Sequence, residues 1–228
     1  MKEAKTMKTL KSPFHQVETL RGMSYGGNQA WFSRKFLKNA GCGVISSTDV
    51  LLHLIGRNQI TRLEYMDLAK DLWKKYLPVI PGFGMNGITL MLGLNRYFWE
   101  HQMPYCACWM ISGKKLYSRI EKMLHADIPI ILSVGPNFPL IWRKEKLNFY
   151  TRNSKGDFVV AARAKAHFVT VTGIDETMIQ ISSWGKEYYI FIQEYEKYVR
   201  ENSSFLVSNI IYVKKYGKGD RRRFLLKN

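Results

Sequence analysis

The apolar residues of this chain follow two different periods along its length, and the period changes near residue 128. Before that point apolar positions recur every three or four residues, which is the spacing of a helix with one buried face. Thr61 and Glu64 have the spacing of a capping box, and Asn86 or Gly87 marks another helix start. The pattern predicts helices over residues 43–55, 61–76, 87–100 and 114–127, with a short strand over 104–111.

After residue 128 apolar and polar positions alternate in short runs that are separated by turn residues. Alternation with a period of two indicates strands with one buried face. Strands are expected over 128–134, 146–152, 157–164, 166–175, 178–185 and 204–213, with a short helix over 192–201. Because the helices come first and the strands follow, the chain is predicted to be an α+β protein with an antiparallel sheet.

The length and composition predict a single folded domain. The 228 residues are 46% hydrophobic, which is enough to bury a substantial core, and two lobes around a cleft are one arrangement open to such a domain. Residues 1–27 are polar and turn-rich, and we expect an N-terminal arm there. The domain would span 28–215, with a helical part over 28–127 and a sheet part over 128–215, and a basic tail would occupy 216–228.

The strong positive charge favours anionic partners in general but does not identify a specific one. The chain has 35 Lys and Arg against 18 Asp and Glu, a formal net charge of +17, which attracts anions such as nucleic acid, anionic lipid or an acidic peptide. The charge is spread along the chain, and no RRM, KH or zinc-finger signature is present. No specific nucleic-acid binding is predicted, although an anion-binding protein remains a third hypothesis.

The cysteines predict a reduced, cytoplasmic protein without a metal or cofactor. There are three, an odd number that gives no disulfide framework. Cys106 and Cys108 would face the same way on a strand, where core packing is expected because a two-cysteine metal site needs further ligands. The N-terminal sequence has no apolar core of a signal peptide, and no stretch approaches the roughly 18 apolar residues of a membrane span.

Cys42 is the first candidate for chemistry. It stands between Gly41 and Gly43 and opens the helix predicted over 43–55. Unpaired N–H groups and the positive end of the helix dipole stabilise a thiolate and lower the pKa of a cysteine at this position. Small neighbours would also let a substrate backbone approach. The alternative is a small buried hydrophobe at a helix cap.

His167 is the histidine best placed to act as a base for this thiol. It lies in an alternating strand and shares a face with Val169 and Val171, 125 residues after Cys42. The other four histidines lie in the predicted arm or on helices. A thiolate requires a nearby base that later protonates the leaving group. A histidine that is only packed into the sheet is the alternative.

A third group is expected to orient the imidazole ring. The following strand carries Ser182 and Ser183, which would lie across from His167 if the turn is at 175–177. Either hydroxyl could accept a hydrogen bond from the ring, and Trp184 could cover that contact from water. Asp175 is a weaker candidate because it belongs to the turn.

Four segments of the sequence resemble papain-like cysteine peptidases. AGCGVISSTDVL, IPIILSV, AHFVTVTGID and ISSWGKEYYI occur in the order seen in that family, within residues 28–213. The resemblance is closest to the bacterial branch that includes the bacteriocin-processing, double-glycine peptidases. It implies a papain-like fold in which an N-terminal helical lobe, with the nucleophile at a helix N-terminus, packs on a C-terminal antiparallel sheet.

The resemblance also implies roles for individual residues. Cys42 matches the nucleophile and His167 the base, and Ser182 stands where the family has Asn or Asp. The family places its oxyanion Gln about six residues before the nucleophile, where this chain has Phe36. Gln29, 13 residues before Cys42, would serve if an insertion loops out, with Asn28 as a lesser option and the Cys42 N–H as the other donor.

Together these features predict a cysteine hydrolase. It would cleave a peptide or amide bond of a peptide or protein substrate through a Cys–His thiolate pair and a thioester, without a cofactor. The alternative is a catalytically impaired module or pseudoenzyme that keeps the fold and holds a peptide in its cleft.

Overall fold

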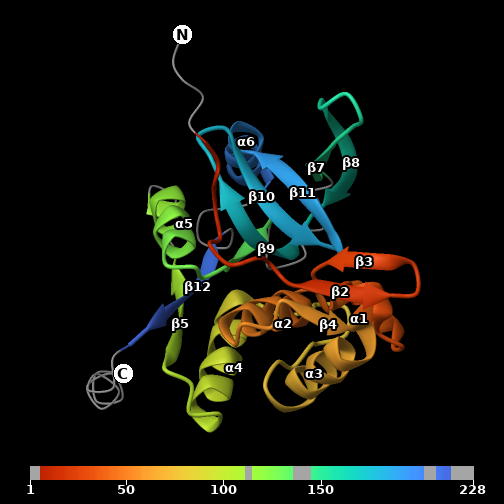
Figure 1. Ribbon diagram of the computed structural model, residues 1–228, viewed down its shortest axis with the longest axis vertical. Helices are drawn as coiled ribbons and strands as arrows, with labels where there is room; N and C mark the ends of the chain where they lie inside the picture. Colours follow the sequence, from red (N-terminus) through yellow and green to blue (C-terminus); the bar gives the residue numbers. More distant parts are fainter. Residues whose placement is uncertain (1–5, 111–114, 136–144, 203–208, 217–228) are drawn as a thin grey trace.

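The computed structural model describes residues 6–110, 115–135, 145–202 and 209–216. It has a helical layer and a large, curved antiparallel sheet (Figure 1). The described helices are α1 (Lys35–Ala40), α2 (Cys42–Leu54), α3 (Arg62–Lys75), α4 (Gly87–Glu100), α5 (Leu116–His125), α6 (Ile192–Asn202) and a short 3₁₀ turn, η1 (Gln29–Trp31). The bounds of α2, α3, α4, α5 and α6 agree closely with the predicted helices, whereas α1 and η1 were not predicted.

The large sheet is antiparallel and has its strands in the order β5-β12-β6-β9-β10-β11-β7-β8, with β1 paired to one end of β9. Its strands are β1 (Lys8–Thr9), β5 (Tyr105–Met110), β6 (Ile130–Val134), β7 (Leu147–Arg152), β8 (Phe158–Ala164), β9 (His167–Ile174), β10 (Met178–Ser183), β11 (Lys186–Phe191) and β12 (Ile210–Lys215). The α+β prediction with an antiparallel sheet is therefore confirmed. Strand β11 was not predicted, and part of the strand expected over 204–213 lies outside the described residues.

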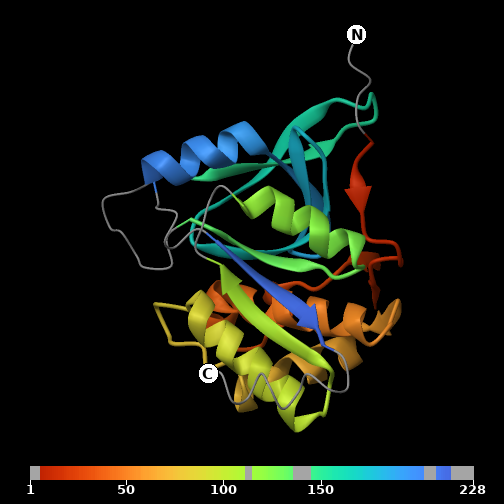
Figure 2. The same ribbon diagram turned by 90° about the vertical axis from the view of Figure 1, so that its left-hand side faces the viewer.

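The central strand β9 positions the site because helices cover it from two sides. Its eight residues are all buried, as are all five of its neighbour β6. Helix α2 packs against β9 and β6 from the helical layer, while α5 contacts β9 and β6, and α6 contacts β7 and β11. Figure 2 shows α5 in green and α6 in blue on the side of the sheet away from α2, α3 and α4. A strand that is covered on both faces can be apolar throughout. A polar residue on such a strand is therefore not explained by contact with solvent and needs another reason.

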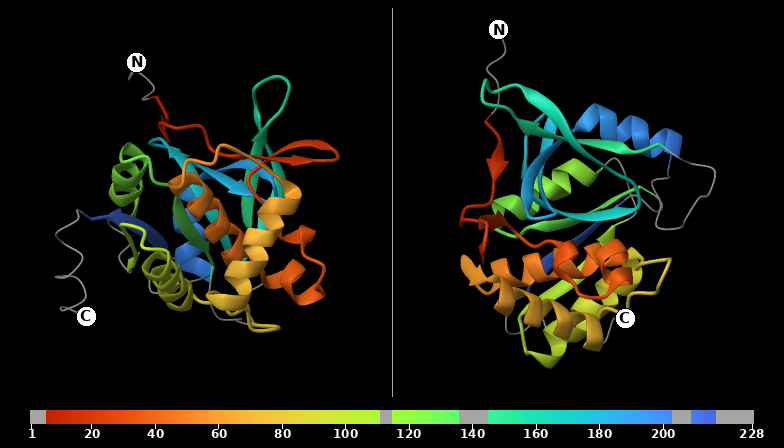
Figure 3. Two further views of the ribbon diagram at one scale, coloured as in Figure 1. Left: turned by 60° about the horizontal axis from the view of Figure 1, so that its bottom comes forward. Right: turned by 90° about the vertical axis from the view of Figure 1, so that its right-hand side faces the viewer.

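The N-terminal segment is part of the fold and differs from the arm expected over residues 1–27. β1 pairs with β9, and a second, three-stranded sheet joins β2 (Gln16–Thr19) to β3 (Gly22–Tyr25) and to β4 (Gln59–Thr61). Figure 3 shows this red segment running beside the large sheet and then to the helical layer. Within it Val17 and His15 are fully buried. The segment looked like an arm because its few apolar residues are carried on very short strands.

The helix starts follow local hydrogen bonding. Thr61 and Glu64 form the expected capping box at α3, and the Asn86 side chain accepts from the Thr89 N–H at the start of α4. Strand β5 lies in the large sheet although it precedes α5 in sequence, so the helical and sheet parts do not divide at residue 128. Among the described residues, no helix combines the length and the apolar character that a membrane crossing requires.

Candidate active site

Cys42 is the first residue of α2 and lies at the junction of two helices. Helix α1 ends at Ala40, and Gly41 serves as the C-cap of α1 and the N-cap of α2. A Cβ atom on Gly41 would lie 2.5 Å from the Leu37 carbonyl oxygen, and one on Gly43 would lie 3.1 Å from a Leu90 methyl carbon. The two flanking glycines therefore permit close packing around the cysteine, which is a different reason from the substrate access expected from the sequence.

The sulfur of Cys42 lies against the beginning of β9. The backbone N–H groups of Phe168 and Gly43 hydrogen-bond to it and favour the thiolate. The residue as a whole is partly exposed, but burial of the sulfur is the largest effect and raises the pKa of the Cys42 thiol. The helix-terminus argument predicted a lowered pKa. That expectation was wrong because loss of hydration outweighs the N–H groups that favour the thiolate.

His167 is the first residue of β9 and is held by two contacts with the end of β10. Its Nε2 lies 2.9 Å from the hydroxyl oxygen of Ser183, and its ring stacks on Trp184 with centroids 4.6 Å apart. Burial lowers the pKa of His167 to about 4, so the imidazole is neutral at pH 7. At rest the two side chains are therefore a neutral thiol and a neutral imidazole.

The turn between β10 and β11 places Trp184 over the imidazole. Trp184 has φ +49° and Gly185 has φ +75°, so both central residues of this two-residue connection are left-handed. Two consecutive left-handed residues characterise the type I′ turn of tight hairpins. The Asn28 side chain donates to the Trp184 carbonyl at 2.9 Å and secures the turn against η1.

The sequence left Ser182 and Ser183 open as partners of His167 and preferred Ser182; the structure places Ser183 there. The Ser182 hydroxyl is instead 2.9 Å from the Tyr25 carbonyl and 3.5 Å from Asp49. Ser182 is the Cα partner of Thr170, so its side chain shares the face of Thr170. His167 is three residues from Thr170, and side chains an odd number apart point to opposite faces of a strand.

Of the two remaining candidates from the sequence, Gln29 lies beside Cys42 and His167, whereas Asp175 lies away from them. Gln29 is almost fully buried in η1, and its Nε2 donates to the Lys38 carbonyl at 2.7 Å. It lines a small inner cavity together with Cys42 and His167. Asp175 accepts hydrogen bonds from the Thr177 and Met178 backbone N–H groups in the turn after β9, at the opposite end of that strand from His167.

Sequence reasoning missed Asp49, a carboxylate that lines the same inner cavity. It is 1% exposed and accepts hydrogen bonds from the Gly27 N–H at 3.0 Å, the Tyr65 hydroxyl at 2.7 Å and the Thr170 hydroxyl at 3.2 Å. The His15 Nε2 lies 3.0 Å from it. A charged residue on the buried face of an apolar helix, two turns after Cys42, was the available signal.

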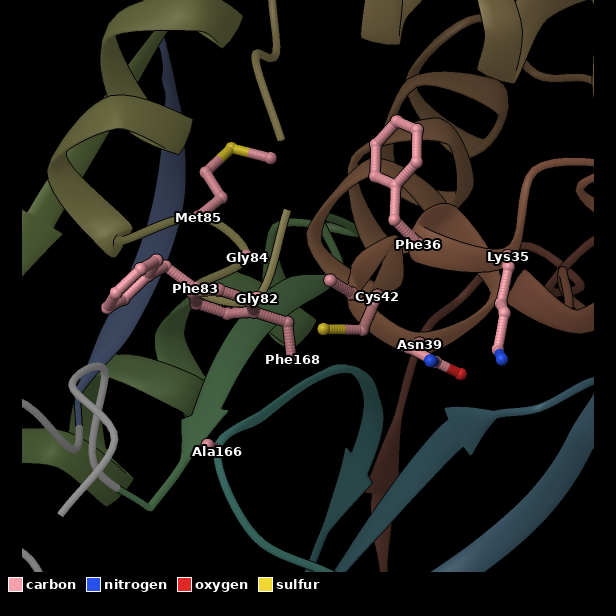
Figure 4. A pocket seen from close by; sticks show the side chains of 11 residues that line it. Lys35, Phe36, Asn39, Cys42, Gly82, Phe83, Gly84, Met85, Ala166 and Phe168 are labelled. Carbon is pink, nitrogen blue, oxygen red and sulfur yellow. The ribbon is translucent and has the colours of Figure 1, made fainter. Parts of the chain in front are cut away.

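A cleft of about 720 Å³ opens beside Cys42. Its lining is mostly apolar and comes from α1, the segment before α4 and the start of β9: Lys35, Phe36, Asn39, Ala40, Cys42, Gly82, Phe83, Gly84, Met85, Ala166 and Phe168. In Figure 4 the Cys42 sulfur lies between Phe83 and Met85 on one side and Phe36, Lys35 and Asn39 on the other. Cys42 also lines the inner cavity that holds His167, so it connects the two spaces.

Comparison with known proteins identifies a similar fold. A solved structure, the "putative C39-like peptidase" from Bacillus anthracis, matches with a TM-score of 0.50 over 83% of this chain and 94% of that chain, at 16% sequence identity. No protein-family model matches the sequence. No curated protein matches it either. At this identity the likeness shows a shared fold.

Proposed function

We propose that this protein is a papain-like cysteine peptidase that cleaves a peptide or amide bond, with Cys42 as nucleophile and His167 as base. The observation that carries the proposal is the convergence of Cys42, His167 and Gln29 on one inner cavity, with Cys42 also at the floor of an open cleft. Gln29 of η1 and Cys42 of α2 are close in the chain, whereas His167 of β9 comes 125 residues after Cys42. Such convergence is the signature of an assembled site rather than of a single packed residue.

The proton transfer follows from the hydrogen bonding of the imidazole. Nε2 faces Ser183, so Nδ1 is the ring nitrogen that serves the thiol. In the proposed step Nδ1 takes the Cys42 proton as the sulfur attacks the substrate carbonyl. The imidazolium then gives that proton to the leaving amine, and a thioester to Cys42 remains. A water molecule, deprotonated by His167, hydrolyses the thioester and regenerates the thiol.

The neutral state of Cys42 and His167 before substrate binds determines when the proton must be transferred. Burial raises the pKa of Cys42 and lowers that of His167, so a preformed ion pair is disfavoured. The base must act while the carbon–sulfur bond forms, when the charge passes to the substrate oxygen. Attack and proton transfer would therefore be coupled, as in general base catalysis.

Two donors would stabilise the oxyanion. One is the Cys42 N–H at the start of α2, where the first N–H groups of a helix have no intrahelical partner. The other is Gln29, whose amide group carries two N–H donors, of which one is used by the Lys38 carbonyl. The remaining donor can serve a substrate oxygen. Removing one such donor from an oxyanion hole typically costs 10²–10³ in kcat.

The hydroxyl of Ser183 is proposed as the positioning group that replaces the family's Asn or Asp. It can accept from Nε2–H, fix the ring tautomer and leave Nδ1 unprotonated for the thiol. Trp184 stacks on the ring and limits its rotation. A hydroxyl stabilises an imidazolium less than a carboxylate does, which is consistent with a slow enzyme.

The cleft favours a peptide substrate. Its volume of about 720 Å³ lies within the range of about 300–1,000 Å³ that is usual for ligand sites. Phe36, Phe83 and Met85 offer apolar contacts on both sides of the nucleophile.

The proposal is tested with a peptide-based acyloxymethyl ketone, an electrophile that alkylates a nucleophilic cysteine held beside a peptide-binding cleft. Mass mapping is expected to find it on Cys42, with labelling lost in Cys42→Ala and retained in the matched variant Cys106→Ala. Peptide turnover should be lost in Cys42→Ala and in His167→Ala. Labelling of Cys42→Ala at the wild-type level would contradict the proposal. Peptide binding without turnover in the wild type would favour the binding-module alternative.

A further inference from the structure

The second candidate for thiol chemistry is a pair of cysteines on the edge strand β5, outside the proposed active site. Cys106 and Cys108 are two residues apart, so their side chains project from the same face of the strand. Both are free; Cys106 is buried and Cys108 is partly exposed. The two thiols hydrogen-bond to each other. Neither residue lines the cleft or the inner cavity.

Two cationic side chains lie over the ring of Tyr212, the residue that is paired with Cys108. On the neighbouring strand β12, Tyr212 is the Cα partner of Cys108 and Lys214 is the partner of Cys106. The Arg119 guanidinium carbon of α5 lies 4.6 Å from the centroid of the Tyr212 ring, and the Lys214 Nζ lies 5.7 Å from it. Residues paired across strands share a face of the sheet, so both cations lie on the side of the two thiols.

This environment shifts the pKa values of the two thiols in opposite directions. The hydrogen bond from Cys106 is the largest effect on Cys108, and with Lys214, Tyr212 and Arg119 it lowers the pKa of Cys108 to about 6, against the opposing effect of burial. The same hydrogen bond and burial raise the pKa of Cys106. Cys108 is the partly exposed sulfur and Cys106 the buried one, so Cys108 is suited to attack as a thiolate and Cys106 to remain a thiol until it is needed.

We propose that Cys106 and Cys108 form a peroxide-reactive dithiol, in which Cys108 attacks and Cys106 resolves. The Cys108 thiolate attacks one oxygen of a hydroperoxide, the O–O bond breaks, and Cys108 becomes a sulfenic acid as water or an alcohol leaves. The Cys106 sulfur then attacks the Cys108 sulfur, the S–O bond breaks, and water leaves with the Cys106 proton. The two thiols lose two electrons and the peroxide gains them.

The strand geometry makes the resulting disulfide reversible. Residues two apart on a strand have Cα atoms roughly 6.4–6.8 Å apart, at the upper limit of about 6.8 Å for disulfides. Closing the bond therefore requires β5 to bend at Ala107. Asn95 of α4 opposes this, because its side chain bonds both the N–H and the carbonyl of Ala107, at 2.7 and 2.9 Å. A strained disulfide is more easily reduced, which is typical of labile rather than structural bonds.

The test uses the full, reduced chain and hydrogen peroxide at pH 7, followed by thiol titration after unfolding and by tryptic mapping. Cleavage after Arg96 and Lys114 leaves both cysteines on one peptide. Free thiols are expected to fall from three to one, with that peptide lighter by two hydrogens and restored by dithiothreitol. Failure to form this bond while Cys42 oxidises first would overturn the proposal, as would a disulfide between two chains.

Variants assign the roles of the two sulfurs. Cys106→Ser should stop at the sulfenic acid, which dimedone traps on Cys108, and Cys108→Ser should lose most peroxide reactivity at both positions. Arg119→Met keeps the length of the side chain without its charge and should slow the first step several-fold. Circular dichroism establishes that each variant is folded, and a variant that fails this check is replaced by the corresponding Ala variant. Equal reactivity of Cys106 and Cys108 in the two Ser variants would refute the assignment.

Discussion

The Nε2 atom of His167 lies 2.9 Å from the hydroxyl oxygen of Ser183, and Trp184 covers that contact by stacking on the imidazole. In the proposed mechanism this relationship gives the two ring nitrogens different tasks: Nε2 would be used for positioning and Nδ1 would serve the thiol. It also depends on a tight turn, because the left-handed conformations of Trp184 and Gly185 bring the indole over the ring. The first prediction concerns this contact.

Replacing Ser183 with Ala is expected to lower kcat about tenfold, which corresponds to about 1.4 kcal/mol of transition-state stabilisation. The physical reason is that Nε2–H would lose its acceptor, so the ring would favour the wrong tautomer. Ser183→Thr keeps the hydroxyl and should retain most of the activity, which a merely structural defect would not predict. Peptide turnover with kcat and KM determined separately measures the effect. An unchanged kcat in Ser183→Ala would remove Ser183 from the site.

The matched variant is Ser182→Ala, because Ser182 is the neighbouring hydroxyl with a different partner. It hydrogen-bonds the Tyr25 carbonyl and so joins β10 to β3. Its loss should reduce stability by about 1 kcal/mol and leave kcat within about twofold. A larger loss of kcat in Ser182→Ala than in Ser183→Ala would reverse the assignment.

The thiols are expected to react with iodoacetamide at pH 6 in an order that their environments set. Burial raises the pKa of Cys42, whereas the lowered pKa of Cys108, about 6, leaves roughly half of it as thiolate at that pH. Cys108 should therefore be alkylated before Cys42 in the protein without substrate. Time-resolved mass mapping of the alkylated chain measures this order. Faster alkylation of Cys42 would indicate an ion pair with His167 already present at rest.

Protonation of His167 is expected to make the fold sensitive to mild acid. In the unfolded chain this group takes a proton below about pH 6.5, whereas in the folded protein its pKa is about 4. The unfolded state therefore binds more protons between these values, and stability falls as pH decreases through that window. The full contribution, present above pH 6.5, is about 3 kcal/mol.

Denaturant unfolding of the wild type and of His167→Gln across pH 4–7 measures this contribution. Other groups titrate in the same range, so the difference between the two profiles isolates His167. The wild type should show the steeper loss of stability toward acid. Parallel profiles would show that the folded-state pKa of His167 is close to its ordinary value.

Asp49 is expected to matter for stability because it satisfies donors from several elements. Asp49→Ala would leave the Gly27 N–H and the His15 ring without this acceptor in a buried region, and the Tyr65 hydroxyl would keep only the Ile45 carbonyl. A buried donor that loses its acceptor costs about 1–3 kcal/mol. Thermal unfolding measures this cost. Asp175→Ala, in an exposed turn, is the control and should cost about 1 kcal/mol; a similar cost for both would contradict a central role for Asp49.

The positive charge is expected to give weak binding to nucleic acid that lacks sequence preference. Such binding rests on release of counterions, so the affinity should fall steeply as salt rises from 50 to 200 mM. Fluorescence anisotropy with labelled duplexes of unrelated sequence measures both properties. Tight, sequence-selective binding at physiological salt would contradict this expectation.

The local elements of this protein were predictable because they depend on neighbouring residues. The apolar period located α2, α3 and α4, and the Thr61–Glu64 capping box gave the start of α3. The motifs around Cys42 and His167 were also visible in the sequence, because each motif is contiguous. What one sequence could not provide was the packing of the short N-terminal strands, whose residues become buried only through contacts with distant elements.

The properties of the candidate site were decided by the tertiary structure. The choice between Ser182 and Ser183 depended on which face of β10 meets His167, and a shift of one residue reverses every side chain of a strand. The pKa of Cys42 depended on burial against β9, which outweighs the local effect of the helix terminus. Asp49 became part of the site only when η1, α3 and β9 closed around α2. Sequence determines which groups are present, but desolvation and side-chain direction arise from contacts between segments that are far apart in the chain.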